Sequence, residues 1–211
     1  NSLDDYIAGD LVAALEVATD ASGGQPVPVI GYCMGGTLAA ALSVLRPKDV
    51  AALLLLAAPW DFHADTGGAP PALSAARPAL ENLIAALGYL PVDTLQAMFF
   101  SIDPLQGWTK FQTFAEMAPE SPAAETFVAL EDWLNDGVPL AAEVARTCLF
   151  GWYGENQPAR GEWIVAGRPI DPAGIACPTL GVLPSQDRIV PPASARQLID
   201  AIPGAESLSP Q

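Results

Sequence analysis

The segment GYCMGG, residues 31 to 36, has the residue types of a nucleophilic turn with Cys33 at its centre. In a G-x-nucleophile-x-G turn, the nucleophile lies between a strand and a helix, and small residues around it relieve backbone crowding. A short apolar run precedes this segment and an alanine-rich stretch follows it. We therefore expect Gly31, Gly35 and Gly36 to form the turn and Cys33 to be the nucleophile. The alternative is a small buried cysteine in a tight glycine turn.

Two electrostatic features accompany such a turn. The backbone N–H of Met34 directly follows the nucleophile, so we expect it to form half of an oxyanion hole. The N-terminus of the following helix is expected to favour the thiolate form of Cys33.

A candidate acid lies in the segment LGVLPSQDRIVP, residues 180 to 191, where an apolar strand ends in a polar turn that carries Asp187. In hydrolases with a strand-turn-helix nucleophile, the triad acid follows a late strand and the histidine comes after it. We therefore expect Asp187 to be the triad acid. An aspartate that only caps a turn is the alternative.

The general base is missing from this pattern. The single histidine, His63, lies between Cys33 and Asp187, which is the wrong order. We expect it to be a solvated loop residue beside Asp61 and Asp65. A cysteine nucleophile still needs a group that takes its proton.

The chain alternates buried strands and helices in its two outer parts. Periodicity predicts a helix over residues 3–20 and strands and helices around the cysteine turn, with a second apolar strand over 50–58. Such alternation favours an α/β fold, a mostly parallel sheet with helices on both faces. Sheet character returns at 162–170 and 177–187, before a helix at 191–202 and a polar tail.

The middle of the chain predicts helices instead of buried strands. We expect a loop over 67–78, then helical segments at 79–88, 92–101, 107–118 and 125–136. We therefore divide the chain into an α/β core, residues 1–61 and 151–211, and a helical cap or lid insertion, residues 62–150. For any single Phe or Trp of this cap, a core position is the expectation.

Composition excludes several classes of protein. A net charge of −15 with nine basic residues disfavours nucleic acid as a partner. No apolar run is long enough to span a membrane, and the acidic first residues do not form a signal peptide. Three widely spaced cysteines predict neither a zinc site nor disulfides, so Cys148 and Cys177 are interpreted as core thiols and the location as cytoplasmic.

Several segments together resemble polyhydroxyalkanoate (PHA) synthases, enzymes of the α/β-hydrolase superfamily that carry a lipase-like box with a catalytic cysteine. GYCMGGT matches the G-x-C-x-G-G box, AAPWDF with Asp61 matches the family's x-x-DF segment, and PSQDRIVPP matches its S-x-x-D-x-IVP turn. The stretch VAGRPIDPAGIACPTLGV is similar to a further family motif, and EDWLND to a cap segment of some members. The likeness covers most of the chain, more loosely from Thr66 to Ser121.

The resemblance implies an acyltransferase that polymerises (R)-3-hydroxyacyl-CoA with release of CoA, through an acyl thioester on Cys33. It implies a hydroxyacyl-CoA substrate, a polyester granule as a partner, a homodimer or partner subunit, and no cofactor, since CoA is a product. In this family the histidine follows the acid by roughly a helix and a strand. The resemblance therefore predicts that the chain is a fragment shortened at both ends, inactive by itself, with the histidine and the second oxyanion donor outside it.

Two other functions stay open. A cysteine hydrolase of the same fold, acting on an ester or lactone, would use the same turn. A non-catalytic, granule-associated partner of an active subunit would need no histidine after Asp187.

Overall fold

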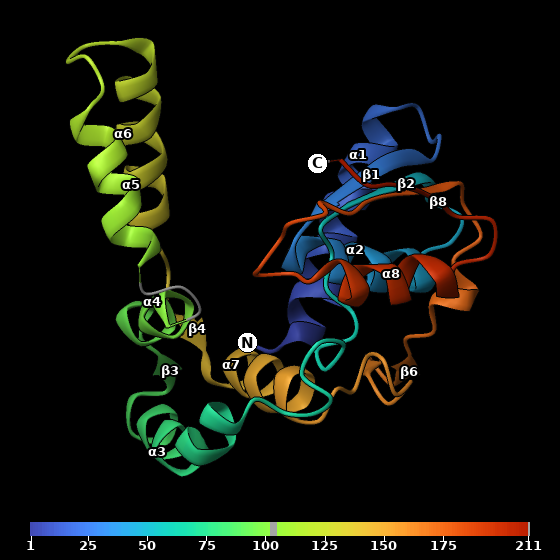
Figure 1. The fold of residues 1–211 in the computed structure, drawn as a ribbon. Coiled ribbons are helices and arrows are strands. Elements are labelled where there is room, and N and C mark those ends of the chain that lie inside the picture. The colour runs from blue at the N-terminus through green and yellow to red at the C-terminus, as the bar shows by residue number, and fades with distance from the viewer. Residues whose placement is uncertain (102–104, 211) are drawn as a thin grey trace.

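A computed structural model describes residues 1–101 and 105–210, without the side chain of Gln106. Its centre is a parallel sheet of four strands in the order β1-β2-β7-β8 (Figure 1). The strands are β1 (Val27–Tyr32), β2 (Val50–Leu56), β7 (Thr179–Val182) and β8 (Glu206–Leu208). The expected α/β fold is therefore confirmed, and part of the predicted polar tail forms the edge strand β8.

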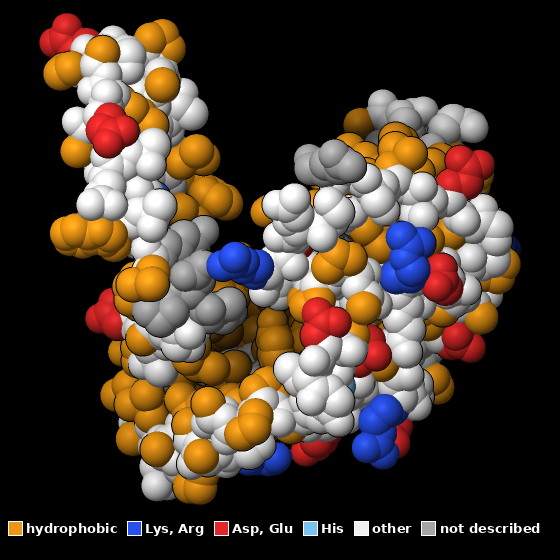
Figure 2. Space-filling view, viewed as in Figure 1, with side chains coloured by type: hydrophobic (Ala, Val, Ile, Leu, Met, Phe, Trp, Pro, Cys, Tyr) orange, Lys and Arg blue, Asp and Glu red, His pale blue; other side chains and the backbone are white. Residues whose placement is uncertain are grey.

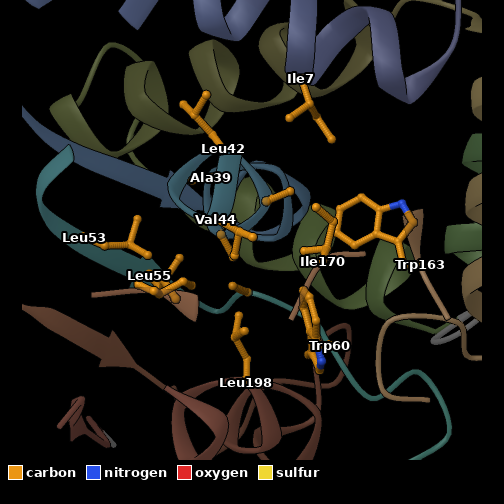
Figure 3. Close-up of a cluster of buried hydrophobic side chains, with 14 of the residues drawn as sticks. Ile7, Ala39, Leu42, Val44, Leu53, Leu55, Trp60, Trp163, Ile170 and Leu198 are labelled. Carbon is orange, nitrogen blue, oxygen red and sulfur yellow. The ribbon is translucent and has the colours of Figure 1, made fainter. Parts of the chain in front are cut away.

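Helices connect these strands, as parallel pairing requires. The π-helix η1 (Asp5–Leu11) and α1 (Val12–Ala21) precede β1, α2 (Met34–Leu45) joins β1 to β2, and α8 (Pro192–Ala201) joins β7 to β8. Figure 3 shows α2 at the centre of the core, between Ile7 and Leu198, with Leu53 and Leu55 of β2 beside it. The sheet ends at its carboxyl edge in the loops that carry the predicted site residues.

The segment between β2 and β7 is mostly helical, as expected. It contains α3 (Pro71–Leu87), β3 (Tyr89–Leu90), α4 (Val92–Phe100), α5 (Gln106–Ala115), α6 (Pro122–Asn135), β4 (Leu140–Ala141) and α7 (Ala142–Arg146). The predicted cap, residues 62–150, includes 102–104, which lie outside the described residues. Strands β3 and β4 pair antiparallel, and α5 and α6 form a hairpin that projects away from the sheet (Figure 1).

The prediction of a loop over residues 67–78 is wrong from Pro71 onward, because α3 begins there. Proline is well tolerated at the first position of a helix. Pro78 lies inside α3, where proline is normally unfavourable. Leu73, Leu80 and Ile84 of α3 are buried in a small cluster of their own, so tertiary packing outweighs local propensity.

The end of the cap meets the α/β core through the π-helix η2 (Thr147–Gly154). Phe150 packs with α3, whereas Trp152 is part of the core cluster. The predicted boundary at residue 150 thus falls inside one helix.

The predicted strand at 162–170 forms a small antiparallel hairpin apart from the main sheet. Its strands are β5 (Ile164–Val165) and β6 (Arg168–Pro169), and the 3-10 helix η3 (Pro172–Gly174) follows. Ala166 and Gly167 both have positive φ, as a two-residue hairpin turn requires.

Several aromatic side chains of the cap are on the surface, which contradicts the expectation of core positions. Trp108 and Trp133 are 69% and 68% exposed, and Phe99, Phe100 and Phe111 are also exposed. The projecting hairpin in Figure 2 carries hydrophobic side chains along its surface. Two helices alone cannot enclose large side chains on all sides, so one face of each stays in solvent. In the described residues, no helix is both long and apolar enough for a membrane span.

Candidate active site

Cys33 occupies the strained turn that its sequence predicts. Its backbone has φ +51° and ψ −126°, and α2 begins at the next residue, Met34. A non-glycine residue with positive φ is uncommon and persists only where the surroundings hold it. Here the N–H of Cys33 donates to the Leu56 carbonyl at 2.8 Å, and its carbonyl accepts from the Gly36 N–H at 2.8 Å. The turn is therefore held from β2 and from α2 together.

The glycines of the turn have unequal roles. A Cβ on Gly31 would lie 2.5 Å from the Cα of Gly36, and one on Gly36 would lie 2.4 Å from the Cβ of Ala58. Such distances are far below van der Waals contact. A Cβ on Gly35 would meet nothing within 4 Å. The close approach of β1 to α2 thus requires Gly31, and that of α2 to the loop after β2 requires Gly36, whereas Gly35 has free space.

Burial controls the acidity of the Cys33 thiol. Loss of solvent is the main reason that its pKa is raised, and the negative charge of Asp187 raises it further. A hydrogen bond from the Met34 backbone N–H to the Cys33 side chain lowers the pKa, as we expect at a helix N-terminus, but this effect is smaller. The thiol therefore needs a base to become a nucleophile near neutral pH.

Asp187 lies in the loop after β7, and its carboxylate is fixed by the backbone. Its Oδ1 accepts from the N–H groups of Ile189 and Val190, both at 2.9 Å. Strand β1, which leads to Cys33, pairs with β2, and β2 pairs with β7. The fold thereby brings the two predicted catalytic residues to the same edge of the sheet, close enough for Asp187 to affect the thiol.

The His63 side chain forms a hydrogen bond with the backbone of η2. It is half-buried, which differs from the expected solvated loop, and its Nε2 is 2.8 Å from the Tyr153 carbonyl oxygen. Because a carbonyl oxygen can only accept, Nε2 is the donor. Because Nε2 carries a proton that it donates to Tyr153, this nitrogen cannot accept the proton of Cys33. The roles of Cys33, Met34 and Asp187 stay predictions.

Three residues near the site were not singled out from the sequence: Phe62, Tyr153 and Asn156. The Asn156 amide donates to Asp61 Oδ1 at 2.8 Å and its Oδ1 accepts from the Phe62 N–H at 2.9 Å. Phe62 stacks on Trp152 and makes an edge contact with Tyr153. Burial raises the pKa of Tyr153 to about 12, with smaller contributions from Cys33 and Cys148. Of the three, only Asn156 has a local sequence signal, because asparagine adopts positive φ more readily than most residues and Asn156 has positive φ.

Two other thiols and one cavity are not part of this site. Cys148 is buried, which raises its pKa to about 12, and Cys177 is half-buried against the core. A cavity of about 340 Å³ is lined by Trp60, Asp171 and Gln197, among others, and by none of the predicted site residues. Within the described part of the chain, no group of three His, Cys, Asp or Glu side chains is arranged to hold a metal ion.

Comparison with known proteins agrees with this geometry. A family model described as alpha/beta hydrolase fold matches residues 1–210. The solved structure of a monoacylglycerol lipase from Paleococcus ferrophilus is similar with a TM-score of 0.55 and 13% identity, over 99% of this chain and 65% of that chain. At this identity the likeness shows the fold alone.

Curated relatives share more of the sequence. The poly(3-hydroxyalkanoate) polymerase subunit PhaC of Haloferax mediterranei is 28% identical over 208 residues, which cover 98% of this chain and 42% of that protein. The protein of the same name from Synechocystis sp. is 28% identical over 209 residues, which cover 96% of this chain and 55% of that protein. The chain thus spans about half the length of these relatives, and the resemblance to PHA synthases is confirmed.

Proposed function

The chain belongs to the alpha/beta hydrolase fold family, and from this premise we propose that it is the catalytic part of a PHA synthase-like acyltransferase. The observation that carries the proposal is a cysteine, not a serine, at the strained turn between β1 and α2, with Asp187 at the same sheet edge. The relatives named as PHA polymerase subunits support the substrate class.

In the proposed reaction, the Cys33 thiolate attacks the thioester carbonyl of (R)-3-hydroxyacyl-CoA. The carbon–sulfur bond to CoA breaks, CoA leaves as a thiolate, and the acyl group remains on Cys33 as a thioester. The N–H of Met34 donates to the carbonyl oxygen while it carries negative charge. The hydroxyl of a second acyl unit then gives its proton to a base, and its oxygen attacks the Cys33 thioester carbonyl. The carbon–oxygen ester bond forms, the carbon–sulfur bond to Cys33 breaks, and Cys33 leaves as the free thiolate.

The raised pKa of Cys33 makes a base essential to the first step. We assign this role to a histidine outside residues 1–211 and give Asp187 the task of orienting it. The two fixed hydrogen bonds to Asp187 Oδ1 suit an orienting role, because they hold the carboxylate in one position. The reaction uses no cofactor, since CoA enters with the substrate and leaves as a product.

We further propose that the enzyme is cytoplasmic and that it binds the surface of an apolar polymer. Exposed apolar side chains on the α5–α6 hairpin, such as Trp108 and Trp133, would contact a polyester granule at little cost, since they are already outside the core. A homodimer or a partner subunit would cover the same kind of surface.

The test uses the protein encoded by the complete reading frame. With (R)-3-hydroxybutyryl-CoA we expect release of CoA and a ladder of hydroxyacyl additions in the intact protein mass. Cys33→Ala should abolish both, whereas Cys177→Ala, which removes another half-buried thiol, should keep both.

Other results would change the assignment. CoA release with free hydroxy acid as the single product would identify a cysteine hydrolase. No CoA release and no adduct on Cys33 would refute the nucleophile and leave a non-catalytic partner as the function.

A further inference from the structure

A small cavity lies between the segment that follows β2 and the loop that carries Asp187. It has a volume of about 50 Å³, and its walls include Pro59, Asp61, Phe62, Tyr153 and Ile189. At roughly 10–15 Å³ per water-sized group, it has room for about three to five such groups. This is the size of a short acyl chain and too small for a long one.

Three contacts connect the cavity to the nucleophilic turn. The carbonyl of Pro59, in its wall, accepts from Thr37 Oγ1 of the first turn of α2 at 2.7 Å. Ile189, which also lines the cavity, donates its N–H to Asp187. Tyr153 also lines the cavity and lies near enough to Cys33 for the thiol to contribute to its raised pKa. An acyl group on Cys33 would therefore have this cavity as a neighbour.

The wall at Phe62 resists expansion. Its ring centroid is 5.5 Å from that of Trp152 and 4.8 Å from that of Tyr153, and its N–H donates to Asn156 Oδ1. Trp152 is only 2% exposed, so the ring behind Phe62 has no free space to move into.

Asp61 gives the cavity one polar wall with a defined orientation. Its Oδ1 accepts from the His63 N–H at 2.9 Å and from the Asn156 amide at 2.8 Å. Both bonds use the same oxygen, so the carboxylate is fixed while Oδ2 remains able to accept from a ligand hydroxyl.

We propose that this cavity binds the acyl chain of the thioester substrate, that it selects short 3-hydroxyacyl groups, and that Asp61 accepts a hydrogen bond from the 3-hydroxyl. The inference rests on the proposed function and adds to it the length and the polar feature that the enzyme recognises. Hydrogen bonds to charged groups are the strong ones, so loss of this contact should cost about tenfold or more in rate.

The experiment measures the first acylation of Cys33 in the complete protein, by CoA release and intact mass. Three substrates are compared: (R)-3-hydroxybutyryl-CoA, butyryl-CoA and (R)-3-hydroxyoctanoyl-CoA. We expect the hydroxybutyryl group to react about tenfold or more faster than the butyryl group. Asp61→Asn keeps an oxygen for the bonds to His63 and Asn156 and should bring this ratio below about threefold.

Asp200→Asn is the matched control, because it removes an exposed carboxylate of α8 and should leave the ratio unchanged. Ile189→Ala enlarges the cavity and should raise the relative rate with the octanoyl substrate. An unchanged ratio in Asp61→Asn, or an unchanged length preference in Ile189→Ala, would overturn the inference alone. If no thioester acylates Cys33 in the parent protein, the proposed function fails and the inference with it.

Discussion

The turn around Cys33 and the α5–α6 hairpin differ in how tightly their residues are packed. At the turn, glycines bring α2 so close to β1 and the β2 loop that a single added carbon would lie 2.4–2.5 Å from its neighbours. In α6 only Ala124 is buried, and Trp133 lies on the surface. Both regions contain large or apolar residues, but only the turn is part of a packed core.

The tryptophans show this difference most clearly. Trp152 and Trp163 are each 2% exposed and meet edge to face at 5.1 Å, in a cluster with Trp60. The hairpin is instead held by Phe127, which contacts Phe111 and Phe114, and by the ion pair of Lys110 with Glu131. Aromatic content alone therefore does not indicate burial, since burial depends on how many elements surround a side chain.

The largest expected effect tests this contrast between tryptophans. Trp163→Ala should lower the free energy of unfolding by about 3–5 kcal/mol, because it empties space in the core. Trp133→Ala should change it by less than about 0.5 kcal/mol, because Trp133 is exposed. Urea unfolding followed by circular dichroism measures both, and similar losses for the two variants would mean that the hairpin is packed against another surface.

A smaller effect is expected within the turn itself. Gly36→Ala should cost about 1–3 kcal/mol or more, because its methyl group would overlap Ala58. Gly35→Ala is the matched control, since it adds the same atom where nothing lies within 4 Å. As a helical position, Gly35 should gain up to about 1 kcal/mol on this change. Thermal unfolding of both variants checks this, and equal stability would show that the turn relaxes to accept the methyl group.

The smallest effect concerns the charge near the thiol. Asp187→Asn removes a negative charge that disfavours the thiolate, so the pKa of Cys33 should fall. It should still stay above the ordinary value of a cysteine, because burial is the larger cause. The rate of Cys33 alkylation against pH, read by peptide mass spectrometry to separate the three thiols, should shift to lower pH. A shift to higher pH, or a similar shift in Asp200→Asn, would contradict this account.

Local sequence was sufficient for the elements that depend on nearby residues. The strand, turn and helix around Cys33 were predictable, because glycine spacing and apolar periodicity act within a few residues. The start of α3 at Pro71 was not, because Leu73 and Leu80 pack with residues of η2 far along the chain. The separation of β5 and β6 from the main sheet was equally invisible, since short strands look alike whichever partner they pair with.

The candidate site divides in the same way. The sequence by itself determined the strand, turn and helix around Cys33 and a late acidic loop at Asp187, because both are short segments with a defined backbone pattern. Only the tertiary structure decided that burial raises the pKa of the Cys33 thiol and that Asn156 donates a hydrogen bond to Asp61. It also decided that Phe62 and Tyr153 line a small cavity. The reason is physical: burial, charge and cavity size arise from segments that meet in space, and one sequence does not state which of them meet.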